Sequence, residues 1–168
     1  MDRGGPIRRP VPLRYPRLAL SYLPMSFAPT GDADGSHASL GFAEKPRLLA
    51  LEDNAESRLL LKHLLRKGFE AVIVSGADET LAVAAEQTFD VLLLDINLGE
   101  KRTGVDVLKA LRALPGYAET PALACTAYAL PGDRERFLEA GFAHYVSKPF
   151  VKAELLGALR DAVRSSGR

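Results

Sequence analysis

Short apolar runs alternate with amphipathic segments from residue 47 to the end of the chain. The apolar runs are typical of strands and occupy residues 47–51, 70–75, 91–95, 121–126 and 144–147. They are apolar at nearly every position rather than at every second one, which is typical of parallel strands covered on both faces. The pattern therefore predicts a five-stranded parallel sheet between two layers of helices.

The segments between and after these runs carry apolar residues at helical spacing. The first predicted helix begins at its N-cap Asn54 and stops at Gly68, and its apolar stripe is Leu60, Leu61, Leu64 and Leu65. The other helices are expected at residues 78–87, 105–115, 133–140 and 155–163. Five strand–helix units joined by right-handed crossovers give a doubly wound α/β sheet, whose ligand site lies beyond the carboxyl ends of the strands.

The first 44 residues differ from the rest of the chain. Six of the eleven prolines lie in residues 1–30, and the segment that follows is rich in Gly, Ser and Asp. Neither part keeps a period of 3.6 or 2, so residues 1–44 are expected to be a disordered extension and linker, and residues 45–168 the folded domain. The only apolar stretch that resembles a signal peptide is interrupted by Pro24, which argues against secretion.

Net charge, the length of the apolar runs and the cysteine count argue against three classes of protein: nucleic-acid binders, membrane proteins and disulfide-bonded proteins. The formal net charge is only +1, and the residues after position 30 carry 17 Lys and Arg against 20 Asp and Glu, so no nucleic acid partner is expected. No apolar run approaches the roughly 20 residues of a membrane span, so no membrane association is expected. The single cysteine, Cys125, excludes an internal disulfide and fits a cytoplasmic protein.

Charged and polar residues follow the predicted strands at one edge of the sheet. Glu52 and Asp53 follow the first strand, Asp95 ends the third, Thr126 ends the fourth, and Lys148 follows the fifth. Three neighbouring carboxylates repel one another unless a cation shares the site, and hard oxygen ligands suit Mg²⁺. With a lysine and a hydroxyl beside them, they form a reception site for a phosphoryl group, and Asp95 is placed to be its nucleophile.

Four motifs carry a family resemblance: "LALEDN" at the first strand, "VLLLDIN" at the third, "ACTA" at the fourth and "HYVSKPF" at the fifth. In order and spacing they resemble the receiver domain of two-component response regulators, over roughly Arg47 to Arg164. The resemblance implies a flavodoxin-like sheet with strand order 2-1-3-4-5. It also implies a phosphoacceptor signalling domain rather than a turnover enzyme.

The resemblance assigns the metal and acceptor roles. Asp95 would accept a phosphoryl group from a phosphohistidine, carried by a histidine kinase or a histidine phosphotransfer protein. Mg²⁺ would be held at Asp95 by Asp53, by Glu52 through water and by the carbonyl of Asn97.

It also assigns the response to phosphorylation. Thr126 and Lys148 would bind the phosphoryl oxygens, and Tyr145 would turn inward when Thr126 moves. The bond from Lys148 to Pro149 is expected to be cis. The face that includes the fourth helix, the fifth strand and the last helix often dimerises in the family, which makes a homodimer one expected state.

The chain departs from the family in the loop after Asp95. Leu98 and Gly99 stand where the family often has Met and Pro, and Gly104 comes one residue late in a longer, basic loop, which could alter docking of the phosphodonor. Asn97 and Tyr128 would flank the path of an attacking water, and slow loss of the phosphoryl group is expected.

Other functions share parts of this pattern. A flavodoxin-like nucleotide or flavin binder needs a phosphate-binding loop where this chain has Glu52 and Asp53. An aspartyl phosphatase often has an acid where this chain has Asn97. Two alternatives stay open: a degenerate receiver that acts as a docking module without phosphorylation, and a receiver fragment of a larger hybrid kinase. The basic residues Arg58, Lys62 and Arg66 form either a solvated helix face or a surface for a partner kinase.

Overall fold

The computed structural model describes residues 45–99, 101–127, 132–149 and 151–166, so the predicted extension, residues 1–44, lies outside the described part of the chain. The strands are β1 (Arg47–Leu51), β2 (Glu70–Val74), β3 (Val91–Asp95), β4 (Ala122–Thr126) and β5 (His144–Ser147). They form one sheet in the order β2-β1-β3-β4-β5, and all neighbouring pairs are parallel. The predicted doubly wound sheet and its strand order are confirmed.

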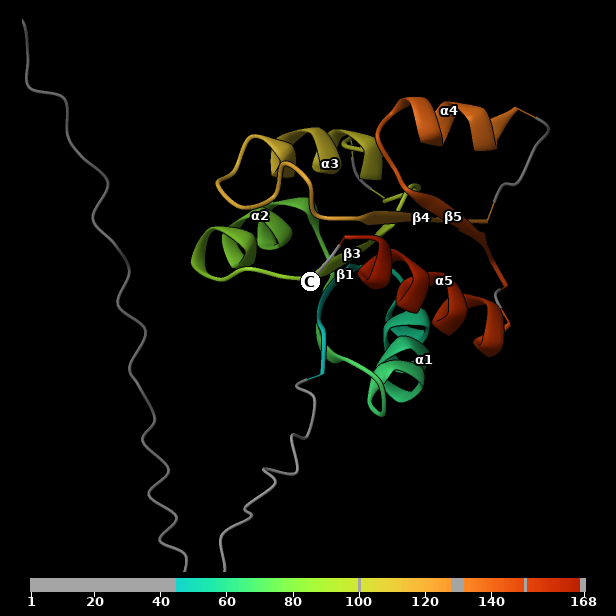
Figure 1. The fold of residues 1–168 in the computed structure, drawn as a ribbon. Coiled ribbons are helices and arrows are strands. Elements are labelled where there is room, and N and C mark those ends of the chain that lie inside the picture. The colour runs from blue at the N-terminus through green and yellow to red at the C-terminus, as the bar shows by residue number, and fades with distance from the viewer. Residues whose placement is uncertain (1–44, 100, 128–131, 150, 167–168) are drawn as a thin grey trace, which may run out of the picture. The chain divides into compact units, whose positions relative to one another are not determined.

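Helices follow each strand and form two layers. They are α1 (Ala55–Leu65), α2 (Ala77–Glu86), α3 (Gly104–Arg112), α4 (Asp133–Glu139) and α5 (Lys152–Ser165). Helices α2, α3 and α4 cover one face of the sheet, and α1 and α5 cover the other (Figure 1). None of the described helices is long and apolar enough to cross a membrane.

The two helical layers explain why the strands are apolar at successive positions. Side chains alternate between the faces of a strand, so β3 sends Leu92 and Leu94 into the core under α2, α3 and α4, and Val91 and Leu93 into the core under α1 and α5. All five residues of β3 are buried. Each fully buried Leu contributes about 1.5–3 kcal/mol relative to an exposed one, so this central strand anchors its last residue, Asp95, firmly.

Helix α1 agrees with its predicted start but not with its predicted apolar stripe. The Asn54 side chain accepts a hydrogen bond from the Ser57 amide at 2.9 Å, so the expected N-cap is present. Leu61 and Leu65 are buried, but Leu60 is 49% exposed, and its predicted place in the core is wrong. The reason is geometric: the buried pair is spaced i, i+4, and a residue one position before Leu61 lies about 100° around the helix from it.

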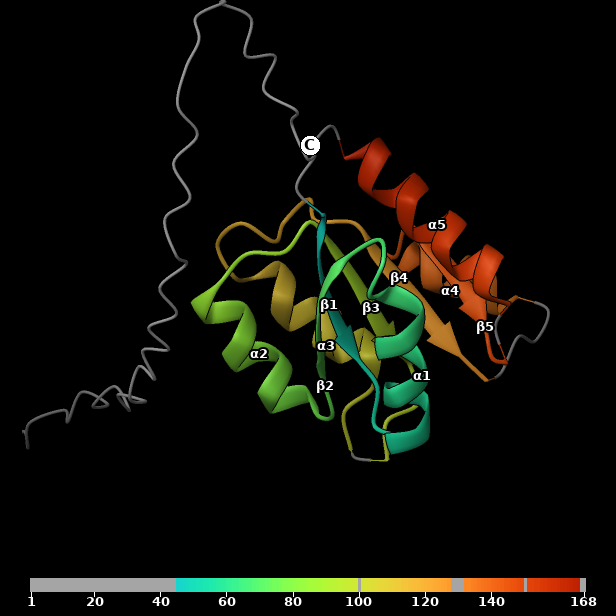
Figure 2. The same ribbon diagram turned by 90° about the horizontal axis from the view of Figure 1, so that it is seen from below.

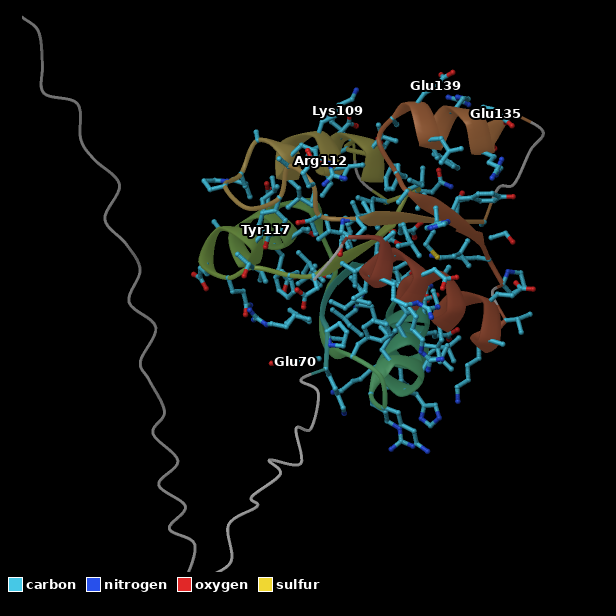
Figure 3. All side chains as sticks on the ribbon, viewed as in Figure 1. Glu70, Lys109, Arg112, Tyr117, Glu135 and Glu139 are labelled. Carbon is cyan, nitrogen blue, oxygen red and sulfur yellow. The ribbon has the colours of Figure 1, made fainter. Side chains whose placement is uncertain are left out.

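The carboxyl ends of the parallel strands lie along one edge of the sheet, as the strand arrows in Figure 2 show. The opposite edge is closed by hydrogen bonds from Arg112 and Tyr117, two side chains that are labelled in Figure 3. There the Arg112 guanidinium donates to the carbonyls of Tyr117 and Thr120, both at 2.6 Å, and the Tyr117 hydroxyl donates to the carbonyl of Gln87 at 2.6 Å. Burial raises the pKa of Tyr117 above its ordinary value, so this hydroxyl stays a donor.

Helix α3 begins very close to the end of β3. Thr103 and Asp106 form a capping box, and the hydrogen bond from the Thr103 amide holds the pKa of Asp106 below its ordinary value. Gly104 donates its amide to the carbonyl of Ile96 at 3.1 Å. A Cβ at Gly104 would lie 2.2 Å from the backbone oxygen of Asp95, so only glycine allows this approach.

We predict opposite effects of alanine at two helical glycines. Gly104→Ala should lower the free energy of unfolding by about 3 kcal/mol, because the backbone of Asp95 must move away from the new methyl group. Gly157→Ala, inside α5 where a Cβ meets nothing within 4 Å, should raise it by about 0.5–1 kcal/mol through helix propensity. Urea unfolding of both variants checks this, and a neutral Gly104→Ala would contradict the close approach.

Candidate functional site

Three carboxylates gather where β1 and β3 end side by side. Glu52 and Asp53 follow β1, and Asp95 is the last residue of β3, its neighbour in the sheet. One oxygen from each lies within 4.8 Å of the others. Glu52 and Asp95 are only 1% and 4% exposed, whereas Asp53 is exposed to solvent. The structure thus brings together the three carboxylates that the sequence placed at this edge.

Lys148 joins the two buried carboxylates. Its Nζ donates to Glu52 Oε2 at 2.5 Å and to Asp95 Oδ2 at 2.7 Å. The lysine follows β5, and its amide donates to the carbonyl of Thr126 at 2.7 Å, which continues the β4–β5 pairing to the site. The Lys148–Pro149 peptide bond is cis, as expected. The ammonium therefore links the ends of β1, β3 and β5 across the edge of the sheet.

Burial and pairing act in opposite directions on these groups. Burial raises the pKa of Glu52 above its ordinary value, although the hydrogen bond from Lys148 offsets part of this rise. Burial alone would lower the pKa of Lys148, but its hydrogen bonds to Asp95 and Glu52 outweigh it and the pKa lies above the ordinary value. One ammonium faces two carboxylates, so the cluster holds excess negative charge that a further cation would relieve.

Asn97 and Thr126 line the other side of Asp95. The Asn97 amide donates to Asp95 Oδ1 at 3.2 Å, and its side-chain amide donates to the Thr126 hydroxyl at 3.3 Å. Thr126 is buried at the end of β4. It also lines a cavity of about 550 Å³ that extends to Phe137 on α4. Any group added to Asp95 would therefore meet a hydroxyl that has room behind it.

Two residues that the sequence did not assign to the site hold its acidic loop. The Arg58 guanidinium donates to the carbonyls of Glu52 and Asp53 at 3.0 and 2.6 Å, so Arg58 is a half-buried clamp rather than part of an exposed basic stripe. The Gly99 amide donates to Asp53 Oδ2 at 2.8 Å. In the sequence, only one feature indicates this contact: Arg58 lies four residues, about one helical turn, after the N-cap Asn54 and so sits on the side of α1 near the loop.

Of the two predicted switch residues, Thr126 lies in the site and Tyr145 does not line it. Tyr145 lies on β5 and is 36% exposed, and it does not line the cavity behind Thr126. Tyr128, expected beside the path of an attacking water, lies outside the described residues. Cys125 is buried beside the cluster, and its burial raises the pKa of the thiol to about 12, which makes it an inert part of the core.

The donor set fits a hard divalent cation. Carboxylate oxygens from Glu52, Asp53 and Asp95 lie close enough to share one ion, and no histidine or thiolate competes among them. Asp53 faces solvent, which leaves room for the water ligands that Mg²⁺ retains. Lys148 holds one oxygen of Glu52 and one of Asp95. The second oxygen of each accepts a long hydrogen bond from a backbone amide, that of Asn54 at 3.4 Å and that of Asn97 at 3.2 Å, and such an oxygen has a further lone pair for a metal ion.

Comparison with known sequences finds a family over most of the chain. Residues 48–160 match the response regulator receiver domain. The chain is 35% identical over 121 residues to the transcriptional regulatory protein CpxR of Escherichia coli, an alignment that covers 71% of this chain and 50% of CpxR. It is 32% identical over 123 residues to the sensory/regulatory protein RpfC of Xanthomonas campestris, covering 71% of this chain and 17% of RpfC. The chain thus spans half or less of these relatives.

Solved structures show the same architecture. The receiver domain of the sensor histidine kinase PA1611 of Pseudomonas aeruginosa, described with a magnesium ion coordinated in its active site cleft, matches with a TM-score of 0.65 and 31% identity, over 71% of this chain and 98% of that one. The chemotaxis protein CheY4 of Vibrio cholerae matches with a TM-score of 0.66 and 29% identity, over 71% of this chain and 99% of that one.

We predict that Lys148→Met destabilises the domain in a pH-dependent way. Without the ammonium, two buried carboxylates face each other, and the free energy of unfolding should fall by about 3 kcal/mol at neutral pH. The pKa of Glu52 already lies above its ordinary value of 4.5 and rises further, so the folded state binds protons more tightly than the unfolded state. The loss of unfolding free energy in Lys148→Met should therefore be largest above the pKa that Glu52 has in the folded variant. It should shrink as the pH falls toward 4.5, the ordinary pKa of Glu52.

Urea unfolding of the wild type and of Lys148→Met at neutral pH and at pH 4.5 checks this prediction. Lys109→Met, at an exposed position of α3 (Figure 3), is the control and should change little. An equal loss at both pH values would mean that Lys148 acts through packing of its aliphatic chain instead.

Proposed function

Because the chain belongs to the response regulator receiver domain family, we propose that it accepts a phosphoryl group on Asp95 and signals through a change in protein–protein binding. The observation that carries this proposal is the bridge from Lys148 to a nearly buried Asp95, beside two further carboxylates. The donor would be a phosphohistidine of a histidine kinase or of a phosphotransfer protein. The chain would act as a phosphoacceptor rather than a turnover enzyme, in the cytoplasm, where its single cysteine stays reduced.

The residues around Asp95 support each part of the transfer. The carboxylate attacks phosphorus as the bond from phosphorus to the histidine nitrogen breaks, and the nitrogen leaves with the electron pair. A Mg²⁺ ion held by Asp53, Asp95, Glu52 and the carbonyl of Asn97 would supply positive charge beside the transferred group. Lys148 is already within hydrogen-bond reach of Asp95 and would pass to a phosphoryl oxygen as the acceptor oxygen loses its charge.

The same geometry supports a switch through Thr126 and Tyr145. The Thr126 hydroxyl would turn to donate to a phosphoryl oxygen, and the adjoining cavity of about 550 Å³ would allow Tyr145 to leave its half-exposed position and move inward. Phosphorylation would thereby favour one member of an existing equilibrium. The exposed face altered by this movement includes β5, which is an edge strand of the sheet and would be a surface for a partner or a second copy.

Helix α1 offers a docking surface for the phosphodonor. Leu59 and Leu60 are 72% and 49% exposed, and they lie in the helix that starts directly after the acidic pair. Exposed neighbouring leucines suit an apolar helical partner, and Lys62 adds charge that steers association. Arg58, for which the sequence left open a solvated face or a partner surface, instead donates hydrogen bonds to the carbonyls of Glu52 and Asp53 in the acidic loop.

A receiver within a longer hybrid kinase is a second candidate. The similarity to RpfC and to the receiver of the PA1611 kinase supports it, since both names describe sensor proteins. The phosphoacceptor chemistry at Asp95 would be the same in either setting.

We predict that Asp95 is the phosphorylated residue and that the reaction needs magnesium. With acetyl phosphate and Mg²⁺, intact-mass measurement should show one added phosphoryl group that hydroxylamine removes. Asp95→Ala should remove it, and so should chelation of the metal, because the anion would otherwise approach an excess of negative charge. Asp161→Asn, on an exposed part of α5, is the control and should be phosphorylated at the wild-type rate. A hydroxylamine-labile phosphate on Asp95→Ala would contradict the assignment.

We predict that a phosphoryl mimic shifts the environment of Tyr145. NMR spectra with beryllofluoride and Mg²⁺ should show changed resonances at Thr126, Tyr145 and α4, because the hydroxyl moves toward the mimic and the cavity behind it fills. In Thr126→Ala the shift at Asp95 should remain and the shift at Tyr145 should disappear. Unchanged Tyr145 resonances in the wild type, with the mimic bound, would exclude the switch.

A further inference from the structure

The cleft between the end of α1 and α5 is lined by basic side chains and by no acidic ones. Its volume is about 310 Å³, and its basic residues are Arg66, Lys67, Lys152 and Arg160, with His63 beside them. We propose that this basic cleft binds a small anion with two or more adjacent phosphate groups, of the nucleoside diphosphate class. It shares no residue with the carboxylate cluster, and the proposal does not depend on phosphorylation of Asp95.

The basic residues of the cleft have no acidic partner within the described part of the chain. Neither guanidinium, of Arg66 or of Arg160, makes an ion pair or side-chain hydrogen bond there, and both side chains are exposed. Most other described arginines are engaged within the fold, by carbonyls, amide or carboxylate oxygens: Arg47, Arg58, Arg102, Arg112, Arg136 and Arg164. The cleft therefore concentrates positive charge that the protein itself leaves unneutralised.

This concentration is local rather than a property of the whole domain. Residues 45–168 carry equal numbers of basic and acidic residues, because the five Arg and four acidic residues of positions 1–44 leave 17 of each. Lys45 adds a further positive charge beside the cleft, since its Nζ donates to the carbonyl of Arg66 at 3.0 Å. Like charges held together by two packed helices repel one another, and a bound polyanion removes that repulsion.

The shape and lining of the cleft favour a phosphorylated small molecule. Two guanidiniums can each hold a phosphate through paired hydrogen bonds, and the two lysines add point charges. Leu64 and Leu156 are half-buried and give the cleft an apolar wall that suits a nucleoside. A volume of about 310 Å³ lies at the lower end of small-molecule sites. A nucleic acid strand would need a basic track that continues beyond the cleft, whereas residues 45–168 as a whole carry as many acidic as basic residues.

Gly68 provides a direct test, because it lines the cleft and a Cβ there meets nothing within 4 Å. We compare Gly68→Asp with Gly68→Asn, which have the same shape and differ in charge. ADP is titrated into the full chain at low ionic strength with a metal chelator present, and the amide shifts are followed by NMR. The shifts should cluster at the end of α1 and along α5, and ADP should bind more tightly than AMP.

The aspartate variant should weaken ADP binding on the order of tenfold, whereas the asparagine variant should stay within about twofold of wild type. Lys152→Gln with Arg160→Gln should have a similar effect, and its charge-matched control is Lys62→Gln with Lys109→Gln, outside the cleft. The proposal would be overturned if ADP did not bind, or if its amide shifts centred on Asp95 and Lys148. It would also be overturned if Gly68→Asp and Gly68→Asn lost ADP affinity equally. Tighter binding of an oligoglutamate peptide or of oligothymidylate than of ADP would overturn it as well.

Discussion

The Lys148 ammonium between two nearly buried carboxylates is the interaction on which the site depends. Lys148 donates a hydrogen bond of 2.5 Å to Glu52, which lies 96 positions earlier in the sequence, and one of 2.7 Å to Asp95, which lies 53 positions earlier. Because all neighbouring strands of this sheet are parallel, the carboxyl ends of β1, β3 and β5 lie at the same edge. The buried charge is tolerable because each carboxylate has a partner, and it stays reactive because one ammonium cannot neutralise both.

The scaffold holds this cluster through backbone contacts as much as through side chains. Gly104 lies against the backbone of Asp95, Gly99 donates to Asp53, and Arg58 clamps the carbonyls of the acidic loop. These contacts come from α1, which covers one face of the sheet, and from α3 with the loop before it, α3 covering the other face. The longer, basic loop after Asp95 is thus tied to the acidic site itself, and Arg102 in it also pairs with Asp78 at 2.8 Å.

Much of this arrangement could be predicted from sequence because it follows from local pattern. Apolar runs identified strands buried on both faces, and polar residues at their ends identified the edge where Glu52, Asp53 and Asp95 meet. The exposure of Leu60 could not be predicted, because four neighbouring leucines fit a stripe equally well until the sheet fixes which side faces it. The clamp by Arg58 and the close approach of Gly104 depend on three-dimensional contacts that leave almost no trace in a charge or hydropathy pattern.

We propose that Asp95 is a magnesium-dependent phosphoryl acceptor and that Asp53, the exposed carboxylate of the cluster, is one of the metal ligands. Titration of Mg²⁺ followed by amide NMR shifts tests it most directly, on the wild type, Asp53→Asn and the control Asp161→Asn. The account predicts saturable shifts around Asp53, Asp95 and Asn97, affinity weakened on the order of tenfold in Asp53→Asn, and no change in the control. Magnesium shifts that are absent in the wild type, or that persist unchanged in Asp53→Asn, would contradict it.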